Sequence, residues 1–235
     1  MQSTASQSFT PDNKLELLFS SDLIPDSVRD ALPAELHVRS PTSSGILLRN
    51  LYVLQIRPLA STDYHRGHLR ILEVLTLAPD VGASRWTEQF SHMRANSPPA
   101  YFSLVIVDKK SDAVVAVGTV FLERKFLRGL GTVGHIEDIA VDKSQQGKKL
   151  GLRVIQALTA ISERMGAYKT ILNCSTSNVP FYEKCGFVQK ENEMVSLSRF
   201  VYQPIVTHTL FRPSTLLSAL EPHGFDERGL SLIHI

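Results

Sequence analysis

His135-Ile136-Glu137-Asp138-Ile139-Ala140-Val141 forms a strand-like run, and the loop Gln146-Gly147-Lys148-Lys149-Leu150-Gly151 follows it closely. Glycines at 147 and 151 allow the backbone to turn tightly, because glycine lacks a Cβ atom. Apolar residues then recur with helical spacing as far as Met165. Successive N–H groups in such a loop converge on an anion at the positive end of the following helix. The stretch therefore predicts a strand that leads into a pyrophosphate-binding loop.

A second block beyond this helix makes the interpretation more specific. It reads Asn178-Val179-Pro180-Phe181-Tyr182-Glu183-Lys184-Cys185-Gly186-Phe187. Together the two blocks resemble the acetyl-CoA-binding core of the GNAT superfamily of N-acetyltransferases. The loop matches the family pattern with Gln146 first and Gly151 last, and departs from it at Lys149, where the family has glycine. This departure is tolerable if residue 149 takes an ordinary helical conformation.

The bulk properties are those of one globular domain. The 235 residues are 43% apolar and 20% charged, and a formal net charge of +2 gives no broad basic field for nucleic acid. The N-terminus has neither the basic start nor the apolar core of a secretion signal. Apolar runs stay well short of the roughly 18 residues that a membrane span needs. We therefore expect a soluble, cytoplasmic protein that binds neither nucleic acid nor membranes.

Cysteine and histidine residues do not predict a metal site. Cys174 and Cys185 lack the spacing of metal ligands or of a redox motif, and we expect both to stay reduced. His65 and His68 share one helix face at i,i+3 spacing. We interpret this pair as surface histidines rather than as metal ligands.

The order of the predicted elements is that of the GNAT fold over residues 51–194, preceded by an N-terminal extension of residues 1–50. In the extension, helical turns are expected around 15–19 and 23–32. The domain then reads as a strand at 51–57, a helix capped by Asp63 that ends near Pro79, a helix at 85–95, and a β-hairpin at 101–108 and 113–123. It continues with a strand at 134–141, a helix from Lys148 to Gly166, a strand at 170–174, a short helix at 179–184 and a strand from Phe187. We predict an α/β (α+β) domain with a mixed, mostly antiparallel central sheet, a splayed pair of parallel strands and flanking helices.

The GNAT resemblance implies which residues hold acetyl-CoA, the expected cosubstrate. The pantetheine amides would pair with exposed backbone at Ile139 to Val141, and Tyr182 would face the thioester sulfur to stabilise or protonate the departing thiolate. Asn178 would bond the pantetheine arm, cap the short helix, or do both. Lys148 and Lys149 either add charge near the phosphates or are ordinary solvated lysines. The full acetyl-CoA set is Ile139, Ala140, Val141, Gln146, Gly147, Lys148, Lys149, Leu150, Gly151, Leu152, Asn173, Asn178 and Tyr182.

Glu137 and Asp138 are adjacent carboxylates inside an otherwise apolar strand, in which side chains should alternate between the two faces. Burying a charge without a partner is costly, so at least one carboxylate should meet a cation or several donors. A substrate amine would be such a partner, and a structural salt bridge is the alternative. With Tyr182, these two carboxylates are the predicted catalytic residues.

The basic, glycine-containing loop Glu123-Arg124-Lys125-Phe126-Leu127-Arg128-Gly129-Leu130-Gly131 lies just upstream. From this loop through Val141, with Tyr168-Lys169 and the Tyr182 block, the chain is similar to the glucosamine 6-phosphate N-acetyltransferase family, and to its fungal type in particular. That family makes N-acetylglucosamine 6-phosphate for UDP-N-acetylglucosamine biosynthesis and is homodimeric, with active sites near the subunit interface. The resemblance implies the sugar phosphate contacts Thr76, Lys125, Phe126, Leu127, Arg128, Glu137, Asp138, Ile139, Tyr168 and Lys169. Lys125, Arg128 and Lys169 are chemically suited to the phosphate.

Two other functions stay open at this point. One is a GNAT enzyme that acts on a protein amine, which the basic cluster disfavours, and the other is an inactive acetyl-CoA-binding module. The general base is also open among Glu137, Asp138, a backbone carbonyl and a chain of waters. Residues 195–235 do not resemble the end of the family, and our hypothesis is that this tail is not native. Arg199 is then the candidate to replace, from a shifted register, the family's phosphate-binding arginine.

Overall fold

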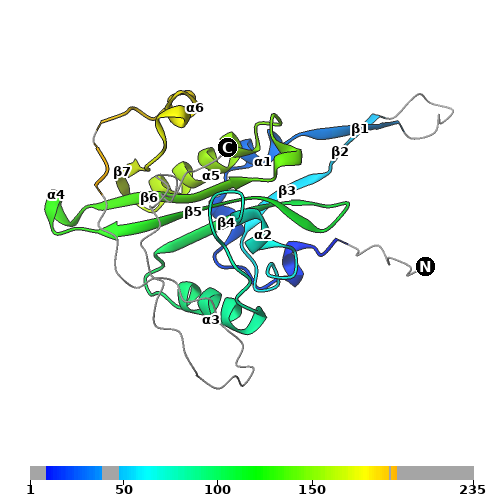
Figure 1. Ribbon diagram of the computed structural model, residues 1–235, viewed down its shortest axis with the longest axis horizontal. Coiled ribbons are helices and arrows are strands. Elements are labelled where there is room, and N and C mark those ends of the chain that lie inside the picture. The colour runs from blue at the N-terminus through cyan, green and yellow to red at the C-terminus, as the bar shows by residue number, and fades with distance from the viewer. Residues whose placement is uncertain (1–8, 39–47, 191, 195–235) are drawn as a thin grey trace, which may run out of the picture.

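The computed structural model describes residues 9–38, 48–190 and 192–194. Its centre is a five-stranded sheet in the order β3-β4-β5-β6-β7 (Figure 1). The first four strands pair antiparallel, and β7 pairs parallel to β6. The strands are β3 Leu54–Pro58, β4 Tyr101–Asp108, β5 Ala113–Arg124, β6 Thr132–Val141 and β7 Ala167–Ile171. The predicted mixed, mostly antiparallel sheet is confirmed.

Helices cover both sides of this sheet. In Figure 1, α5 (Leu150–Arg164) lies on one side and α3 (Ala83–Arg94) on the other. Helix α5 packs on β4 to β7, and α2 (His68–Leu72) packs on β5 and β6. Of the apolar residues predicted to share one face of this helix, those within α5 are buried, among them Val154, Leu158 and Ile161 at 0% exposure, whereas Met165 at the C-cap is half-buried. The remaining helices are α1 Asp26–Asp30, α4 Leu127–Leu130 and α6 Val179–Lys184, with 3-10 turns at Asp12–Lys14, Ser21–Leu23, Lys143–Gln145 and Thr176–Asn178.

The parallel pair separates part way along its length. Pairing runs from Thr132 with Ala167 to His135 with Ile171, where β7 ends, whereas β6 continues to Val141. The second half of β6 therefore has no β7 neighbour among the described residues. This is the expected splayed pair, and it leaves the backbone of Ile139 to Val141 without a strand partner on that side.

The N-terminal segment packs onto the domain. Leu18, Ile24, Val28 and Leu32 are each at most 6% exposed and belong to the same core as the sheet. The helix expected around residues 15–19 is wrong, because Leu17 forms a β-bridge with Ala60 there. The helix expected at 23–32 is confined to α1, since Pro25 precedes its first residue.

Several boundaries differ from the sequence predictions. The strand expected at 51–57 is two strands, β2 (Leu48–Tyr52), which pairs with β1 (Ala34–Val38) in a separate two-stranded sheet, and β3. The strand expected at 170–174 ends at Ile171, and residues 187–190 and 192–194 contain no strand. The tail at 195–235, with Arg199, lies outside the described residues.

Asp63 is not a helix cap, and α2 begins only at His68. Its carboxylate is fully buried and accepts hydrogen bonds of 2.7 Å from Nη1 and Nη2 of Arg57, as well as one of 2.8 Å from the Ala60 N–H. Arg57 is itself 1% exposed in β3. Because a buried guanidinium needs a counterion, tertiary pairing outweighs the local capping preference of this aspartate.

Candidate active site

A β-bulge in β6 shapes the site. Val117 pairs with Ala140 and Thr119 with Glu137, so Asp138 and Ile139 together face the single residue Gly118. Asp138 adopts a left-handed backbone with φ +58°. Left-handed aspartates are uncommon and concentrate at functional sites.

The bulge changes the direction of the carboxylates. In a regular strand Glu137 and Asp138 would face opposite sides of the sheet. Here both line one cavity of about 540 Å³, so the expected alternation is wrong at this point. The walls come from α2, α3 and strands β4 and β5, and include His68, Leu72, Trp86, Phe90, Ser103 and Thr119.

The pKa values of Glu137 and Asp138 are both raised, as expected for carboxyl groups that lack a cationic partner. Burial, with the neighbouring charge of Asp138, raises the pKa of Glu137. Partial removal of the Asp138 carboxyl group from water likewise raises its pKa, although the residue keeps some solvent exposure. Within residues 9–38, 48–190 and 192–194, neither carboxylate forms an ion pair or hydrogen bond. The structural salt bridge considered from the sequence is therefore not seen in the described part of the chain.

Tyr182 lies on α6 and is 2% exposed. Its hydroxyl is buried and has no hydrogen-bond partner among the described residues. Burial raises the pKa of this phenol, and negative charge at Cys174, Cys185 and Glu137 adds to the effect. The hydroxyl therefore stays protonated, and the side chain presents a buried O–H group. Asn178 occupies the N-cap of α6, but its side chain makes no capping bond.

The glycine loop leads directly into α5. Gly147 has φ +80°, and Lys149 stands at the helix N-cap with φ +61°, a left-handed conformation. The ordinary helical conformation considered for residue 149 is therefore wrong. Lysine here takes a backbone conformation that favours glycine, at a cost of roughly 1–2 kcal/mol. The first N–H groups of α5 point out of its N-terminus beside this loop, because they precede the first intrahelical bond.

The predicted phosphate-binding residues lie at one end of the sheet, away from the cavity lining. Glu123 accepts a hydrogen bond from Lys125 Nζ (2.7 Å), and its other oxygen lies 2.9 Å from His135 Nε2. Arg128 is stacked over the Tyr168 ring at 5.7 Å. Lys169 and Thr76 are exposed. Of the predicted substrate residues, only Glu137 and Asp138 line the 540 Å³ cavity.

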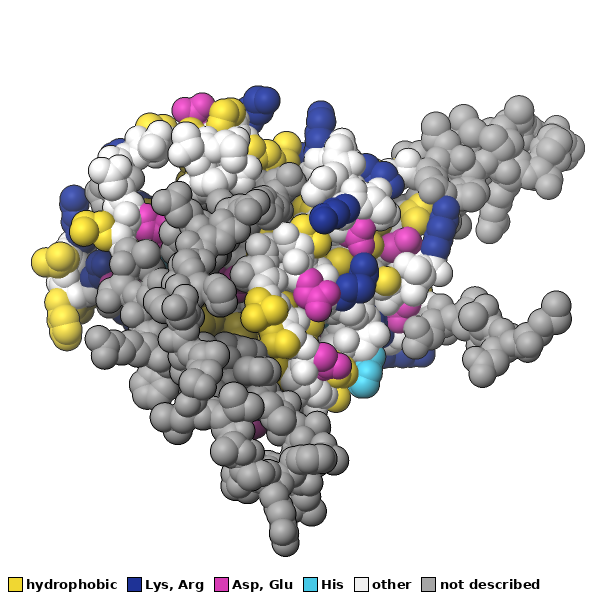
Figure 2. Space-filling view, in the orientation of Figure 1, with side chains coloured by type: hydrophobic (Ala, Val, Ile, Leu, Met, Phe, Trp, Pro, Cys, Tyr) yellow, Lys and Arg dark blue, Asp and Glu magenta, His cyan; other side chains and the backbone are white. Residues whose placement is uncertain are grey.

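The loop that carries Lys125 and Arg128 also exposes apolar side chains. Phe126, Leu127 and Leu130 are 95%, 73% and 72% exposed. Apolar side chains project at the left edge of Figure 2, where α4 lies in Figure 1. Such a cluster is typical of an interaction surface.

The burial of His68, which lines the cavity, differs from the sequence prediction. His68 is 9% exposed, so its interpretation as a surface histidine is wrong. Its Nδ1 accepts a hydrogen bond of 3.2 Å from Nε1 of Trp86. The sequence does contain an indication of this burial, because His68 lies at helical spacing from the buried Ile71 and Leu75.

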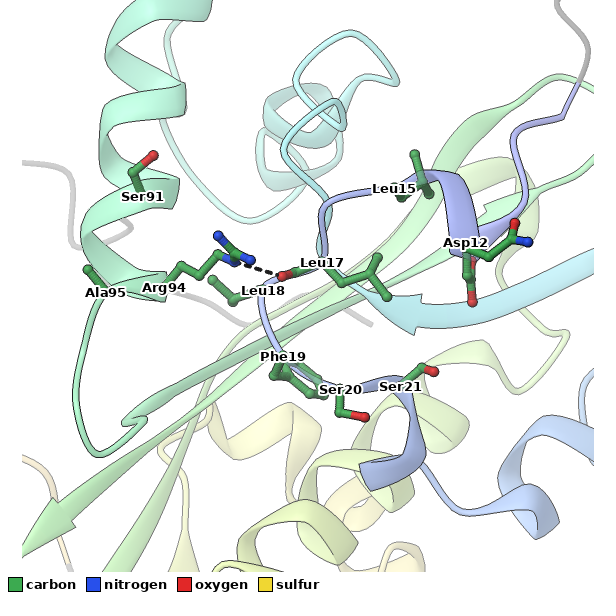
Figure 3. A pocket seen from close by; sticks show the side chains of 11 residues that line it. Asp12, Leu15, Leu17, Leu18, Phe19, Ser20, Ser21, Ser91, Arg94 and Ala95 are labelled. Atoms are coloured by element: carbon green, nitrogen blue, oxygen red, sulfur yellow. Dashed lines mark hydrogen bonds between the residues drawn. The ribbon is translucent and has the colours of Figure 1, made fainter.

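A second hollow of about 830 Å³ lies between the N-terminal segment and the end of α3 (Figure 3). Arg94 points across it and donates from Nε to the Leu17 carbonyl at 3.1 Å. None of the predicted site residues lines this hollow. The cavity beside the β6 bulge is therefore the candidate active site.

Comparison with known proteins agrees with the observed fold. The acetyltransferase (GNAT) family matches residues 69–187. The chain is 42% identical to glucosamine 6-phosphate N-acetyltransferase 1 of Dictyostelium discoideum, over 60% of this chain and 88% of that protein. It is also 42% identical to the glucosamine 6-phosphate N-acetyltransferase of Candida albicans, over 59% and 92%. Among solved structures, glucosamine-6-phosphate N-acetyltransferase from Arabidopsis thaliana is similar with a TM-score of 0.60 and 37% identity, over 61% of this chain and 97% of that one.

Proposed function

The chain belongs to the GNAT family of acetyltransferases, and from this we propose that it transfers the acetyl group of acetyl-CoA to the 2-amino group of D-glucosamine 6-phosphate. The products are N-acetyl-D-glucosamine 6-phosphate and CoA. The relatives that carry this activity in their names match over most of their length. The bulge is the observation within the molecule that supports the proposal, because it brings Glu137 and Asp138 to one cavity, where neither carboxylate has a partner among the described residues.

The residues at the fork of β6 and β7 fit acetyl-CoA. Backbone at Ile139 to Val141 lies beyond the last β7 pairing and can bond the pantetheine amides. Gln146, Gly147 and the first turn of α5, including Leu150, Gly151 and Leu152, offer N–H groups to the pyrophosphate, with Lys148 and Lys149 beside them. Asn173 and Asn178 complete the set along the pantetheine arm. Acetyl-CoA supplies the activated acetyl group, so a bound metal is not needed.

The chemistry is a direct acyl transfer with both substrates bound together. Glu137 and Asp138 bind the substrate ammonium, which then loses a proton to one of these carboxylates, to a backbone carbonyl or through water. The free amine then attacks the thioester carbonyl, so that a C–N bond forms and the C–S bond breaks. Tyr182 donates its proton to the departing thiolate, and the proton that the nitrogen loses as the tetrahedral intermediate collapses restores the phenol. Holding the two reactants together removes the entropic cost of their encounter.

The phosphate of the sugar is assigned to Lys125, Arg128 and Lys169, with Thr76, Phe126, Leu127, Ile139 and Tyr168 around the sugar. These cations lie outside the cavity that holds Glu137 and Asp138 in the same chain. The exposed apolar residues beside them would be buried by a second copy of the chain. We therefore propose a homodimer in which the loop at 123–131 contributes across the interface.

The setting of the reaction follows from its product. N-acetylglucosamine 6-phosphate is a precursor in UDP-N-acetylglucosamine biosynthesis, and we place the chain in that pathway in the cytoplasm. The net charge of +2 gives no basic surface of the kind that nucleic acid requires. In the described part of the chain, helices are all too short or too polar to cross a bilayer.

Release of CoA from acetyl-CoA tests the proposal. Purified full-length chain should release CoA when glucosamine 6-phosphate is added, and much less with unphosphorylated glucosamine. Release only with peptide amines would favour a protein acetyltransferase. Acetyl-CoA binding without turnover of any amine would favour an inactive binding module, and either result would overturn the proposed substrate.

A further inference from the structure

The cavity beside the bulge contains a hydrogen-bond donor that the acyl transfer does not use. His68 begins α2, lines the cavity and is 9% exposed. Its Nδ1 accepts the Trp86 Nε1–H at 3.2 Å. An indole nitrogen can only donate, so this bond fixes the tautomer of the histidine and leaves the proton on Nε2.

The protonation state of His68 is also fixed. Burial lowers the pKa of its ring to about 4, against a smaller opposing effect from Asp63. The imidazole is therefore neutral near pH 7, with Nε2–H as its only donor. Within the described residues, this Nε2–H has no hydrogen-bond partner.

The other polar groups of the cavity do not duplicate this donor. Ser103 and Thr119 bond each other through their hydroxyls at 2.7 Å, which leaves one rotatable O–H of the pair as a donor. Arg85 and Gln89 from α3 and Tyr101 from β4 line the cavity but are exposed to solvent. Glu137 and Asp138 are acceptors when ionised. Among the described residues that line the cavity, His68 therefore offers a buried N–H whose direction is fixed by the Trp86 hydrogen bond, whereas the free hydroxyl of the Ser103–Thr119 pair can rotate.

We propose that His68 is a specificity-determining residue whose Nε2–H donates to a ring hydroxyl of the amino sugar. The inference rests on the proposed function. A neutral N–H cannot accept from an ammonium group, and a phosphate dianion is better matched by the lysines and arginine assigned to it. The remaining acceptors on the substrate are the hydroxyl oxygens and the ring oxygen, and we assign the donor to a hydroxyl. The donor on α2 and the acceptors on β6 then orient the sugar, with its amine at the carboxylates and a hydroxyl at His68.

Substitution combined with substrate analogues tests the assignment. His68→Phe removes the donor, and kcat/KM for glucosamine 6-phosphate should fall about tenfold, the scale of one neutral hydrogen bond. His68→Gln keeps a donor near the position of Nε2 and should recover part of this loss. His65→Phe, the same change at an exposed histidine of the same segment, is the matched control and should behave like the wild-type chain.

The analogues separate contact with substrate from a merely structural role. The 1,5-anhydro, 3-deoxy and 4-deoxy forms of glucosamine 6-phosphate each lack one ring hydroxyl. For one of them, His68→Phe and the wild-type chain should have equal kcat/KM, because the acceptor is already missing. The same loss with all three analogues, or no loss with the parent substrate, would overturn the inference. Failure of the wild-type chain to acetylate the parent substrate would instead overturn the proposed function and this inference with it.

A spectroscopic measurement checks the tautomer without reference to activity. Nitrogen NMR of the imidazole should show His68 protonated at Nε2 alone at neutral pH. In Trp86→Phe, where Nδ1 has lost its donor, a mixture of both neutral tautomers is expected. A wild-type ring protonated at Nδ1 would contradict the assignment.

Discussion

Tyr182→Phe separates the catalytic role of a hydroxyl from its effect on stability. The hydroxyl is buried, belongs to a side chain only 2% exposed, and has no partner among the described residues. A buried polar group without a partner costs about 1–3 kcal/mol of stability. Removing one oxygen atom should therefore stabilise the chain, even though it removes the proton donor for the thiolate.

The expected magnitudes follow from this geometry. A gain of about 1 kcal/mol corresponds to a rise in Tm of about 2–4 °C for a chain of this size. Loss of a general acid lowers kcat by about 100-fold or more. The KM for glucosamine 6-phosphate should change little, because the proposed partner of the phenol is the thioester rather than the sugar.

Thermal unfolding and steady-state CoA release measure the two effects on one sample. Tyr64→Phe is the matched control, since its hydroxyl bonds Asp80 at 2.7 Å at the surface. That variant should keep both kcat and Tm near the wild-type values. Full activity in Tyr182→Phe, or a Tm several degrees below that of the wild-type chain, would refute the reasoning.

Three further predictions concern binding, folding and acid stability. Lys125→Ala should raise the KM for glucosamine 6-phosphate at least about tenfold, with a smaller effect on kcat, because a charged hydrogen bond contributes about 1.5–3 kcal/mol. An unchanged KM in initial-rate assays would show that Lys125 does not bind the phosphate. Asp63→Asn should lower the free energy of unfolding by about 3–5 kcal/mol in denaturant titration, because the buried Arg57 guanidinium loses its charged partner. A loss below about 1 kcal/mol would contradict a stabilising role for this buried ion pair. The pKa of His68 is about 4 in the folded chain, against an ordinary value of 6.5. Between these two pH values the unfolded chain binds a proton at this residue that the folded chain does not bind. The free energy of unfolding should therefore fall by roughly 3 kcal/mol as the pH drops from 6.5 to 4. His68→Phe should flatten this part of the stability profile, and an unchanged slope would show that the ring is not held neutral.

The sequence predicts the elements whose patterns are local. The apolar repeat of α5, the hairpin of β4 and β5, and the short helix α6 all appear near their expected positions. These elements are set by side-chain periodicity and by turn residues, which a single chain displays directly. The sequence also predicts the glycine loop. It does not predict the left-handed conformation of Lys149, because lysine rarely adopts that conformation.

What the sequence does not reveal depends on contacts between distant residues. The bulge at Asp138 arises from the register between β5 and β6, and no local pattern marks it. Asp63 looks like a helix cap until its partner Arg57 is known. His68 looks like a surface histidine until Trp86 is placed beside it. The direction of the carboxylates and the donor in the cavity could therefore be found only in the folded chain.

A single-turnover experiment tests the central claim most directly. The full-length chain is first saturated with acetyl-CoA, freed of excess ligand, mixed with glucosamine 6-phosphate and quenched at intervals. We predict that N-acetylglucosamine 6-phosphate and CoA appear together, in equal amounts and at one rate, without an acetylated protein intermediate. Retention of the acetyl group on CoA in the presence of the amino sugar, or its transfer to a side chain of the protein, would contradict the account.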